Sequence, residues 1–158
     1  MYFKEFEIRW NDLDANKHLG NSSYVEFMSH ARMSFLTDHG IGLDVMASFG
    51  LGPIVLYEHI YYFKEIRMDT VVRVSIEVDG MTNDTRFVRL LHNFYDDNGK
   101  HLAHAEMLFS FIDMKTRKLG RIPDVIRDRI MTFPKSSDFK ILSVEDTRKY
   151  GKRPIDLA

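Results

Sequence analysis

Residues 22–39 form the one long helical segment that the sequence predicts, and the chain after residue 54 is patterned mainly as strands. The spacing of apolar residues gives this helix a wide apolar stripe, made of Tyr24, Val25, Phe27, Met28, Ala31, Phe35 and Leu36. Ser23 and Glu26 have the spacing of a capping box, and Gly40 is expected to end the helix. One helix cannot cover both faces of a flat sheet, but a strongly curved sheet can wrap around it. We therefore expect an α+β fold, a single domain in which a curved antiparallel sheet surrounds one central helix.

The strand segments are recognised by alternation of apolar and polar residues. Residues 2–10 alternate, with Phe6, Ile8 and Trp10 on one face. Four later strands, separated by the turn signals "DGMTND", "DDNGK" and "TRKLG", are expected within residues 54–66, 70–78, 85–97 and 101–114. Short helices are expected at 43–49, where an irregular turn is the alternative, and within 122–133.

The polar, weakly patterned residues 134–158 are expected to be a C-terminal extension that is partly disordered, leaving residues 1–133 as the domain.

Composition excludes several classes of protein. A chain of 158 residues with 44% apolar residues suits one domain, and its net charge of −1 gives no overall attraction to nucleic acid or an anionic membrane. Its apolar runs are too short to span a bilayer, and the N-terminus does not resemble a signal peptide. The absence of cysteine excludes disulfides, thiolate metal sites and a cysteine nucleophile. We expect a cytoplasmic protein.

Five polar residues crowd the ten positions before the helix: Asp12, Asp14, Asn16, His18 and Asn21. Unpaired N–H groups at a helix start stabilise negative charge, including the oxyanion formed when a carbonyl is attacked. Asp14 is placed to act as a base or a nucleophile, His18 to orient water or share a proton, and the two asparagines to hold substrate. Helix capping and turn formation account for the same residue types. The pattern alone leaves both interpretations open.

The segment "RWNDLDANKHLGNSSYVEFMSHAR" resembles the hot-dog-fold thioesterases of the 4-hydroxybenzoyl-CoA type. It resembles still more closely the acyl-ACP thioesterases, which carry Asp-x-Asn-x-His followed by Val-Asn-Asn. Asp14, Asn16 and His18 match the first motif, and Asn21 matches the second asparagine of the pair. The segment "TRKLGRIPDVIRDRI" is similar to the element that ends a hot-dog repeat, so the resemblance covers about residues 5–131.

The resemblance implies roles for these residues in hydrolysis of an acyl thioester. Asp14 would be the base or nucleophile, with His18 and Asn16 as partners, and the backbone N–H near Asn21 would polarise the thioester carbonyl. Glu65 falls where the acyl-ACP enzymes place a further catalytic acid. The implied substrate is an acyl-CoA or an acyl-ACP, within fatty acid metabolism, and no cofactor is implied.

Two features depart from the family pattern. Gly20 replaces the first asparagine and Leu19 replaces valine, and a glycine here could loosen the turn or let a ligand approach the backbone. The acyl-ACP enzymes carry two hot-dog repeats, whereas this chain is long enough for one. We therefore expect a homodimer or a dimer of dimers, with Asp14 of one chain facing the strands of the other.

Substrate-binding candidates outside the motif are Tyr24, at the helix start, and Arg86 and Arg89, expected on one strand. The arginines have the chemistry to bind coenzyme A phosphates, although such residues are more often solvated surface charges. A metal site is not expected, because His101 and His104, three apart on a strand, should point to opposite faces.

Two alternative functions remain on the same fold. One is hydration or dehydration of an acyl thioester, and the other is binding of an acyl thioester without catalysis.

Overall fold

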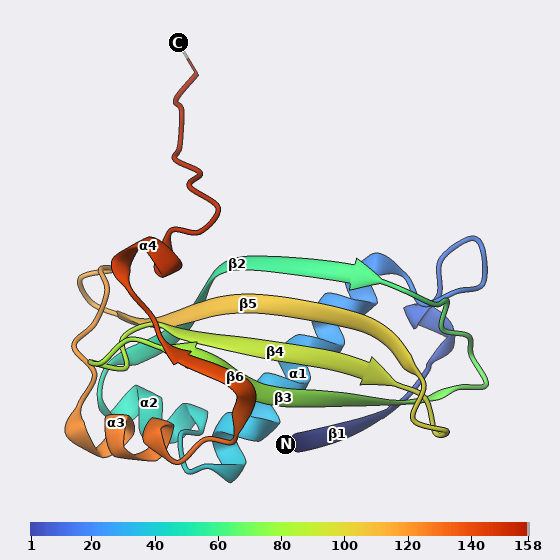
Figure 1. Ribbon diagram of the computed structural model, residues 1–158, viewed down its shortest axis with the longest axis horizontal. Helices are drawn as coiled ribbons and strands as arrows, with labels where there is room; N and C mark the ends of the chain where they lie inside the picture. The colour runs from blue at the N-terminus through green and yellow to red at the C-terminus, as the bar shows by residue number, and fades with distance from the viewer. Residues whose placement is uncertain (158) are drawn as a thin grey trace.

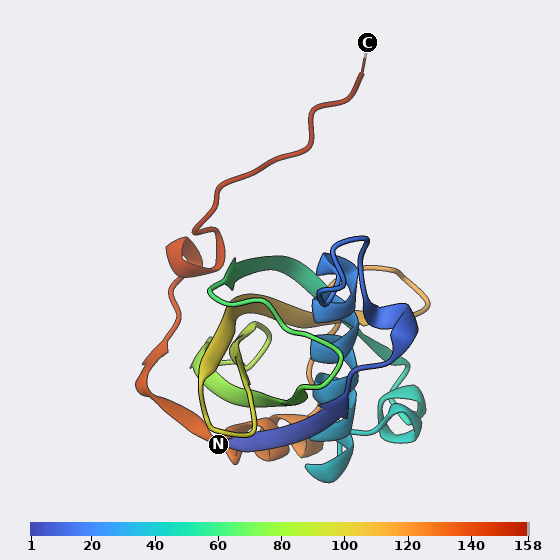
Figure 2. The same cartoon turned by 90° about the vertical axis from the view of Figure 1, so that its right-hand side faces the viewer.

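A curved six-stranded sheet surrounds helix α1 (Asn21–Asp38) in the computed structural model, which describes residues 1–157 (Figures 1 and 2). The strands are β1 (Tyr2–Glu7), β2 (Leu51–Tyr62), β3 (Val71–Met81), β4 (Val88–Tyr95), β5 (His101–Asp113) and β6 (Lys135–Ile141). Their order is β1-β3-β4-β5-β2, and β6 pairs with β3. All pairings are antiparallel except that of β6. The predicted α+β fold with one central helix is confirmed.

The inner face of the sheet is apolar, as the alternation predicted. Its buried apolar residues include Val72, Val74, Ile76 and Val78 on β3, and Ala103, Ala105, Met107, Phe109 and Phe111 on β5. Met28, Ala31 and Phe35 of α1 are completely buried within the same core. Burial of this shared surface is the main attraction between α1 and the sheet.

Helix α1 ends as predicted and begins differently. Gly40 has φ +75°, and its N–H donates to the Thr37 carbonyl at 2.9 Å. The N–H of Ile41 donates to the Leu36 carbonyl at 2.7 Å, and both of these side chains are buried, which completes a Schellman motif. At the other end, the predicted Ser23–Glu26 capping box is wrong. Gly20 is the N-cap and offers no side chain.

The first strand is shorter than predicted. β1 pairs with β3 only as far as Glu7 opposite Val71, because β3 begins there. The chain then turns into a 3-10 helix, η1 (Trp10–Asp12), as the Asp12 carboxylate accepts hydrogen bonds from the Arg9 N–H and guanidinium. Trp10 is consequently 77% exposed and does not share a buried face with Phe6.

Strand β6 was not predicted from the sequence pattern. It runs parallel to the end of β3, beyond the point where β1 stops, and Leu142 N–H donates to the Met81 carbonyl at 2.9 Å. Its side chains are mostly exposed, so no apolar alternation marks it. A domain boundary at residue 133 stays a prediction, and β6 attaches the segment after it to the sheet.

Three short helices complete the fold: α2 (Leu43–Ser48), α3 (Asp124–Met131) and α4 (Val144–Thr147). Helices α2 and α3 lie at the end of the sheet away from the loop that precedes α1 (Figure 1). Within residues 1–157, no helix combines the length and apolar character needed to cross a membrane.

A histidine is among the buried polar residues without a hydrogen-bond partner. His92 lies on the inner face of β4, is fully buried, and neither ring nitrogen makes a hydrogen bond to any residue that the structure describes. Burial holds the pKa of His92 well below its ordinary value of 6.5, and the nearby Arg32 charge acts in the same direction. The folded protein therefore excludes a proton that the unfolded chain binds below about pH 6.5.

The free energy of unfolding should consequently fall as pH is lowered from 7.5 to 5.5. One excluded proton corresponds to a slope that approaches about 1.4 kcal/mol per pH unit below the unfolded pKa. His92→Leu should reduce the slope by that amount, as measured by urea unfolding at each pH. The exposed His30→Leu variant is the matched control. Equal slopes for wild type and His92→Leu would contradict this assignment.

Candidate active site

The loop before α1 is fixed to the helix by the backbone of Asp12. The Asp12 carbonyl oxygen accepts hydrogen bonds from the Gly20 N–H and the Ser23 hydroxyl, each at 2.8 Å. The N–H of Leu19 donates to the Ile66 carbonyl at 2.7 Å, which joins the loop to the segment after β2. The loop, the start of α1 and the chain leaving β2 therefore meet at one end of the sheet.

Gly20 does not need the special conformational freedom of glycine. Its φ of −65° is open to any residue, and a Cβ built there would meet only ordinary contacts, the nearest 3.5 Å away at the Asp12 carbonyl oxygen. The backbone of this loop therefore does not require a glycine at position 20.

Asp14 is both a turn former and an available carboxylate. Its Oδ1 accepts hydrogen bonds from the backbone N–H groups of Asn16 at 2.8 Å and His18 at 3.2 Å. Its Oδ2 makes no hydrogen bond to any residue between 1 and 157, and the side chain is exposed. One oxygen thus holds the loop while the other is free to meet a ligand.

Both carboxylate oxygens of Glu65 have partners. Its Oε2 lies 2.8 Å from Nε2 of His18, and its Oε1 accepts hydrogen bonds from the Arg67 guanidinium, that from Nε at 2.8 Å. The pairing of Glu65 with His18 joins residues that are far apart in sequence. Asp14 contacts the backbone of His18, and Glu65 contacts its imidazole ring.

A hollow of about 310 Å³ lies at the start of α1. It is lined by Asp14, His18, Leu19, Asn21, Tyr24, Tyr62, Phe63, Lys64 and Glu65. The structure therefore gathers four of the five predicted catalytic residues, together with the substrate-binding candidate Tyr24. Asn21 is the first residue of α1, so its N–H has no partner within the helix.

Tyr24 forms a neutral, apolar wall of the hollow. Its ring packs against Tyr62, with centroids 4.9 Å apart, and against Phe94 at 5.1 Å. Burial raises its pKa to about 12, with smaller contributions from Tyr62 and the negative charge of Asp14. The phenol therefore stays protonated at neutral pH.

Asn16, the fifth predicted catalytic residue, lines an adjacent hollow of about 440 Å³ with His18 and Arg67. The backbone N–H of Asn16 donates to Asp14, and this hydrogen bond connects Asn16 to the site.

The two arginines lie apart from this hollow. Arg89 forms a buried ion pair with Asp79 at 2.6 Å, and the exposed Arg86 lies 3.5 Å from Asp84. Their predicted placement on one strand is wrong, because β4 begins at Val88 and Arg86 belongs to the preceding turn. Neither arginine lines the hollow that contains Asp14. Their role in substrate binding stays a prediction.

Some residues of the site were not anticipated. Tyr62, Phe63 and Lys64 line the hollow, and their only signal in the sequence was their position next to Glu65. Asp12, by contrast, is buried and paired with Arg9 at 2.7 Å, which lowers the pKa of its carboxyl. Asp12 therefore supports the loop.

The histidine pair on β5 also differs from expectation. Leu102 forms a bulge, since Tyr95 lies opposite His101 while Phe94 lies opposite Ala103. The bulge brings the His101 and His104 rings to 6.3 Å between centroids, so the argument that they point to opposite faces was wrong. Across residues 1–157, no three histidine, aspartate or glutamate residues are grouped so as to hold a metal ion.

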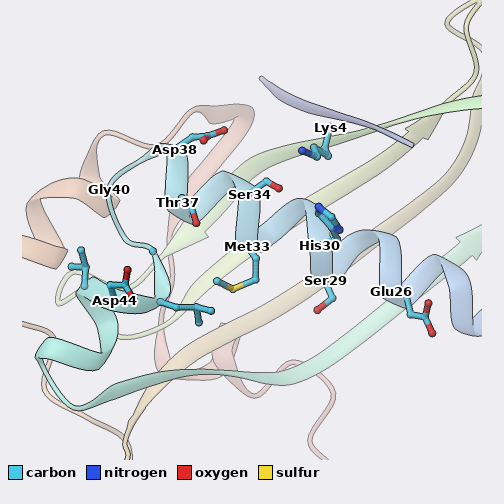
Figure 3. A pocket seen from close by; sticks show the side chains of 13 residues that line it. Lys4, Glu26, Ser29, His30, Met33, Ser34, Thr37, Asp38, Gly40 and Asp44 are labelled. Atoms are coloured by element: carbon cyan, nitrogen blue, oxygen red, sulfur yellow. The ribbon is translucent and has the colours of Figure 1, made fainter. Parts of the chain in front are cut away.

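Another hollow, of about 1010 Å³, is lined by the exposed side of α1 and by residues of β1 and α2. Figure 3 shows Ser29, His30 and Ser34 of α1 lining it, together with Lys4 of β1 and Asp44 of α2. None of the predicted site residues lines this hollow.

Comparison with known proteins gives the fold and the site their context. Residues 8–130 match the family model of the thioesterase-like superfamily. The chain belongs to this superfamily. The long-chain acyl-CoA thioesterase FadM of Escherichia coli K12 is 20% identical over 126 residues, which cover 80% of this chain and 94% of FadM.

Solved structures of thioesterase-like proteins have the same fold. A Staphylococcus aureus protein in complex with CoA matches with a TM-score of 0.77 and 18% identity, covering 99% of this chain and 94% of its own. The DHNA-CoA thioesterase of S. aureus matches with a TM-score of 0.74 and 17% identity, covering 96% of this chain and 95% of its own. The predicted resemblance to hot-dog thioesterases is confirmed, and the fold is a single hot-dog domain.

The bond from Ser23 to the Asp12 carbonyl provides a test of how this thioesterase-like site is held. Ser23→Ala should lower the free energy of unfolding by about 1 kcal/mol, because a buried carbonyl loses one of its two donors. Ser22→Ala, on the exposed side of the same helical turn, should change it by less than about 0.5 kcal/mol. Chemical denaturation measures both, and equal losses in the two variants would contradict the assigned role.

Proposed function

We propose that this protein hydrolyses an acyl thioester to a free acid and a thiol, with Asp14 as the catalytic carboxylate. The observation that carries the proposal is the free Oδ2 of Asp14 in a hollow at the N-terminus of α1. The proposal is also supported by membership of the thioesterase-like superfamily and by the match to FadM.

The geometry suits attack on a thioester carbonyl. With the carbonyl oxygen at the Asn21 N–H, the helix N-terminus stabilises the oxyanion of the tetrahedral intermediate. Asp14 either removes a proton from a water molecule that attacks the acyl carbon, or attacks that carbon itself to give an anhydride, which water then hydrolyses. On both routes the carbon–sulfur bond breaks and the thiolate takes up a proton.

His18 and Glu65 are placed to support this step. The Glu65 carboxylate fixes the orientation of the His18 ring, whose edge lines the same hollow as Asp14. Because both oxygens of Glu65 are already bonded, Asp14 is the better candidate for the reacting carboxylate.

Coenzyme A is the favoured carrier. FadM is named as an acyl-CoA thioesterase, and the S. aureus structure contains CoA. Acyl carrier protein is the alternative carrier, and a place in fatty acid metabolism is part of this proposal.

Asp14→Asn and Asp14→Ala should reduce thiol release from acyl-CoA substrates by about 100-fold or more, because the base or nucleophile is lost. Thiol release is followed across a panel of acyl-CoAs and acyl-ACPs. Asp44→Asn on α2 is the matched control and should keep wild-type activity, since it lies at the opposite end of α1. Hydrolysis by folded Asp14 variants at the wild-type rate would overturn the role of Asp14.

The same panel separates the alternative functions. Formation of a 3-hydroxyacyl product from an enoyl thioester without thiol release would indicate a hydratase. A thioester that stays bound and intact for hours would indicate a binding protein.

A homodimer is proposed from the unpaired edge of the sheet. β2 is an edge strand of 12 residues, and its exposed apolar side chains include Val55, Leu56 and Tyr61. A long apolar edge of this kind favours pairing with a second strand. Because Tyr62, at the end of the same strand, lines the site, a partner chain would lie close to the reacting groups.

Sedimentation should show a dimer at micromolar concentration. Leu56→Lys should raise the dissociation constant about tenfold or more, because a charge on the paired edge is desolvated. Val144→Lys, at an exposed position on α4, is the matched control. A stable wild-type monomer would contradict the proposal.

A further inference from the structure

Three polar residues lie in the otherwise apolar layer between α1 and the sheet: Arg32 of α1, Glu58 of β2 and His92 of β4. The Arg32 guanidinium donates through one terminal nitrogen to Oε1 of Glu58 at 2.9 Å, and the two side chains are only 12% and 18% exposed. An ion pair in such a position is generally no more stabilising than apolar residues of similar volume. Stability of the fold therefore does not explain why these residues are there.

The ion pair lies further along α1 and β2 than the candidate active site. Tyr24 lines the site, and Arg32 follows it by eight residues on α1, roughly 12 Å along the helix axis. On β2, Tyr62 contacts Tyr24 at the site, and Glu58 lies four residues away on the same face of the strand.

Strand β4 also carries a polar residue next to one that lies at the site. Phe94 contacts Tyr24, His92 comes next on the same face of the strand, and Leu90 lies beyond it. His92 is therefore at the level of the ion pair, and both of its ring nitrogens are without partners in the part of the chain that the structure describes.

A small cavity of about 130 Å³ lies beyond the ion pair, with Arg32 in its wall. Its other lining is largely apolar and includes Leu36, Ile54, Leu90, Met107 and Phe109. A chain that starts at the thioester site and follows α1 and β2 thus passes Arg32 and Glu58 before it reaches an apolar end.

We propose that Arg32 and Glu58 select acyl groups that carry a hydroxyl at the chain position that reaches the ion pair. This inference rests on the proposed thioesterase function. The pair is neutral overall, so a carboxylate or ammonium on the substrate would bring an uncompensated charge into the layer. A plain methylene would leave the remaining N–H donors of Arg32 without a partner. A hydroxyl accepts from Arg32 and donates to Glu58, so one small neutral group satisfies both sides of the pair.

The first test compares dodecanoyl-CoA with a series that carries one hydroxyl at successive positions along the same chain. Over one or two neighbouring positions, kcat/KM for wild type should exceed that for the plain chain about tenfold, the effect of hydrogen bonds to charged groups. This comparison needs no variant. A plain chain that is hydrolysed as well as every hydroxylated one would overturn the proposal.

The second test removes both charges together, since removing one would leave the other unpaired. Arg32→Met/Glu58→Met should lose the preference for the hydroxyl and hydrolyse plain dodecanoyl-CoA at least as well as wild type. The matched control is Glu106→Gln/Lys149→Met, which breaks a 3.0 Å ion pair outside this layer and should keep the preference. Retention of the preference by the first double variant would contradict the assignment.

Calorimetric titration with non-hydrolysable alkyl-CoA thioethers separates this inference from the proposed function. Tighter binding of the hydroxylated thioether, lost in the Arg32→Met/Glu58→Met variant, supports the inference even if no thioester is cleaved. Hydrolysis without discrimination, and equal thioether binding, would uphold the thioesterase and reject the selectivity.

Discussion

Burial of α1 inside the curved sheet is the constraint on which the rest of this structure depends. Met28, Ala31 and Phe35 are completely removed from water, and each large apolar side chain buried in this way contributes about 1.5–3 kcal/mol. The helix can satisfy this demand only by lying along the concave side of the sheet, with its N-terminus at one end. The unpaired N–H groups of that terminus are thereby presented where the loop before α1 and the chain after β2 also meet.

The three acidic residues at this end are distinguished by their partners. Asp12 is buried and bonded to Arg9, so its carboxylate holds the loop. Both oxygens of Glu65 are bonded, and they orient His18. Of the three, only Asp14 has one carboxylate oxygen that closes a turn and a second that makes no hydrogen bond within residues 1–157. One side chain thus closes a turn and still has an unbonded carboxylate oxygen, so the two interpretations of the sequence are not exclusive.

Periodicity in the sequence was sufficient for the central helix, its end at Gly40 and the inner face of the sheet, because burial acts on every residue of those patterns. Features decided by single competing hydrogen bonds were not predictable in this way. Ser23 bonds the Asp12 carbonyl in place of a cap, and the bulge at Leu102 turns the histidines of β5 toward one another. β6 gave no signal because its side chains are mostly exposed. Glu65 was assigned to the site from family resemblance alone, since the long-range contact with His18 leaves no local pattern in the sequence.

Strand β2 forms one edge of the sheet, and this edge bears on the site. Its outer side is paired with no strand among residues 1–157, as is the outer side of β1 at the opposite edge. β2 also supplies Tyr62 to the hollow at Asp14 and Glu58 to the ion pair with Arg32. A strand that covered β2 would therefore lie close to both the hollow at Asp14 and the ion pair of Arg32 with Glu58. Under the proposed function, pairing of this edge and enclosure of the substrate would involve the same strand.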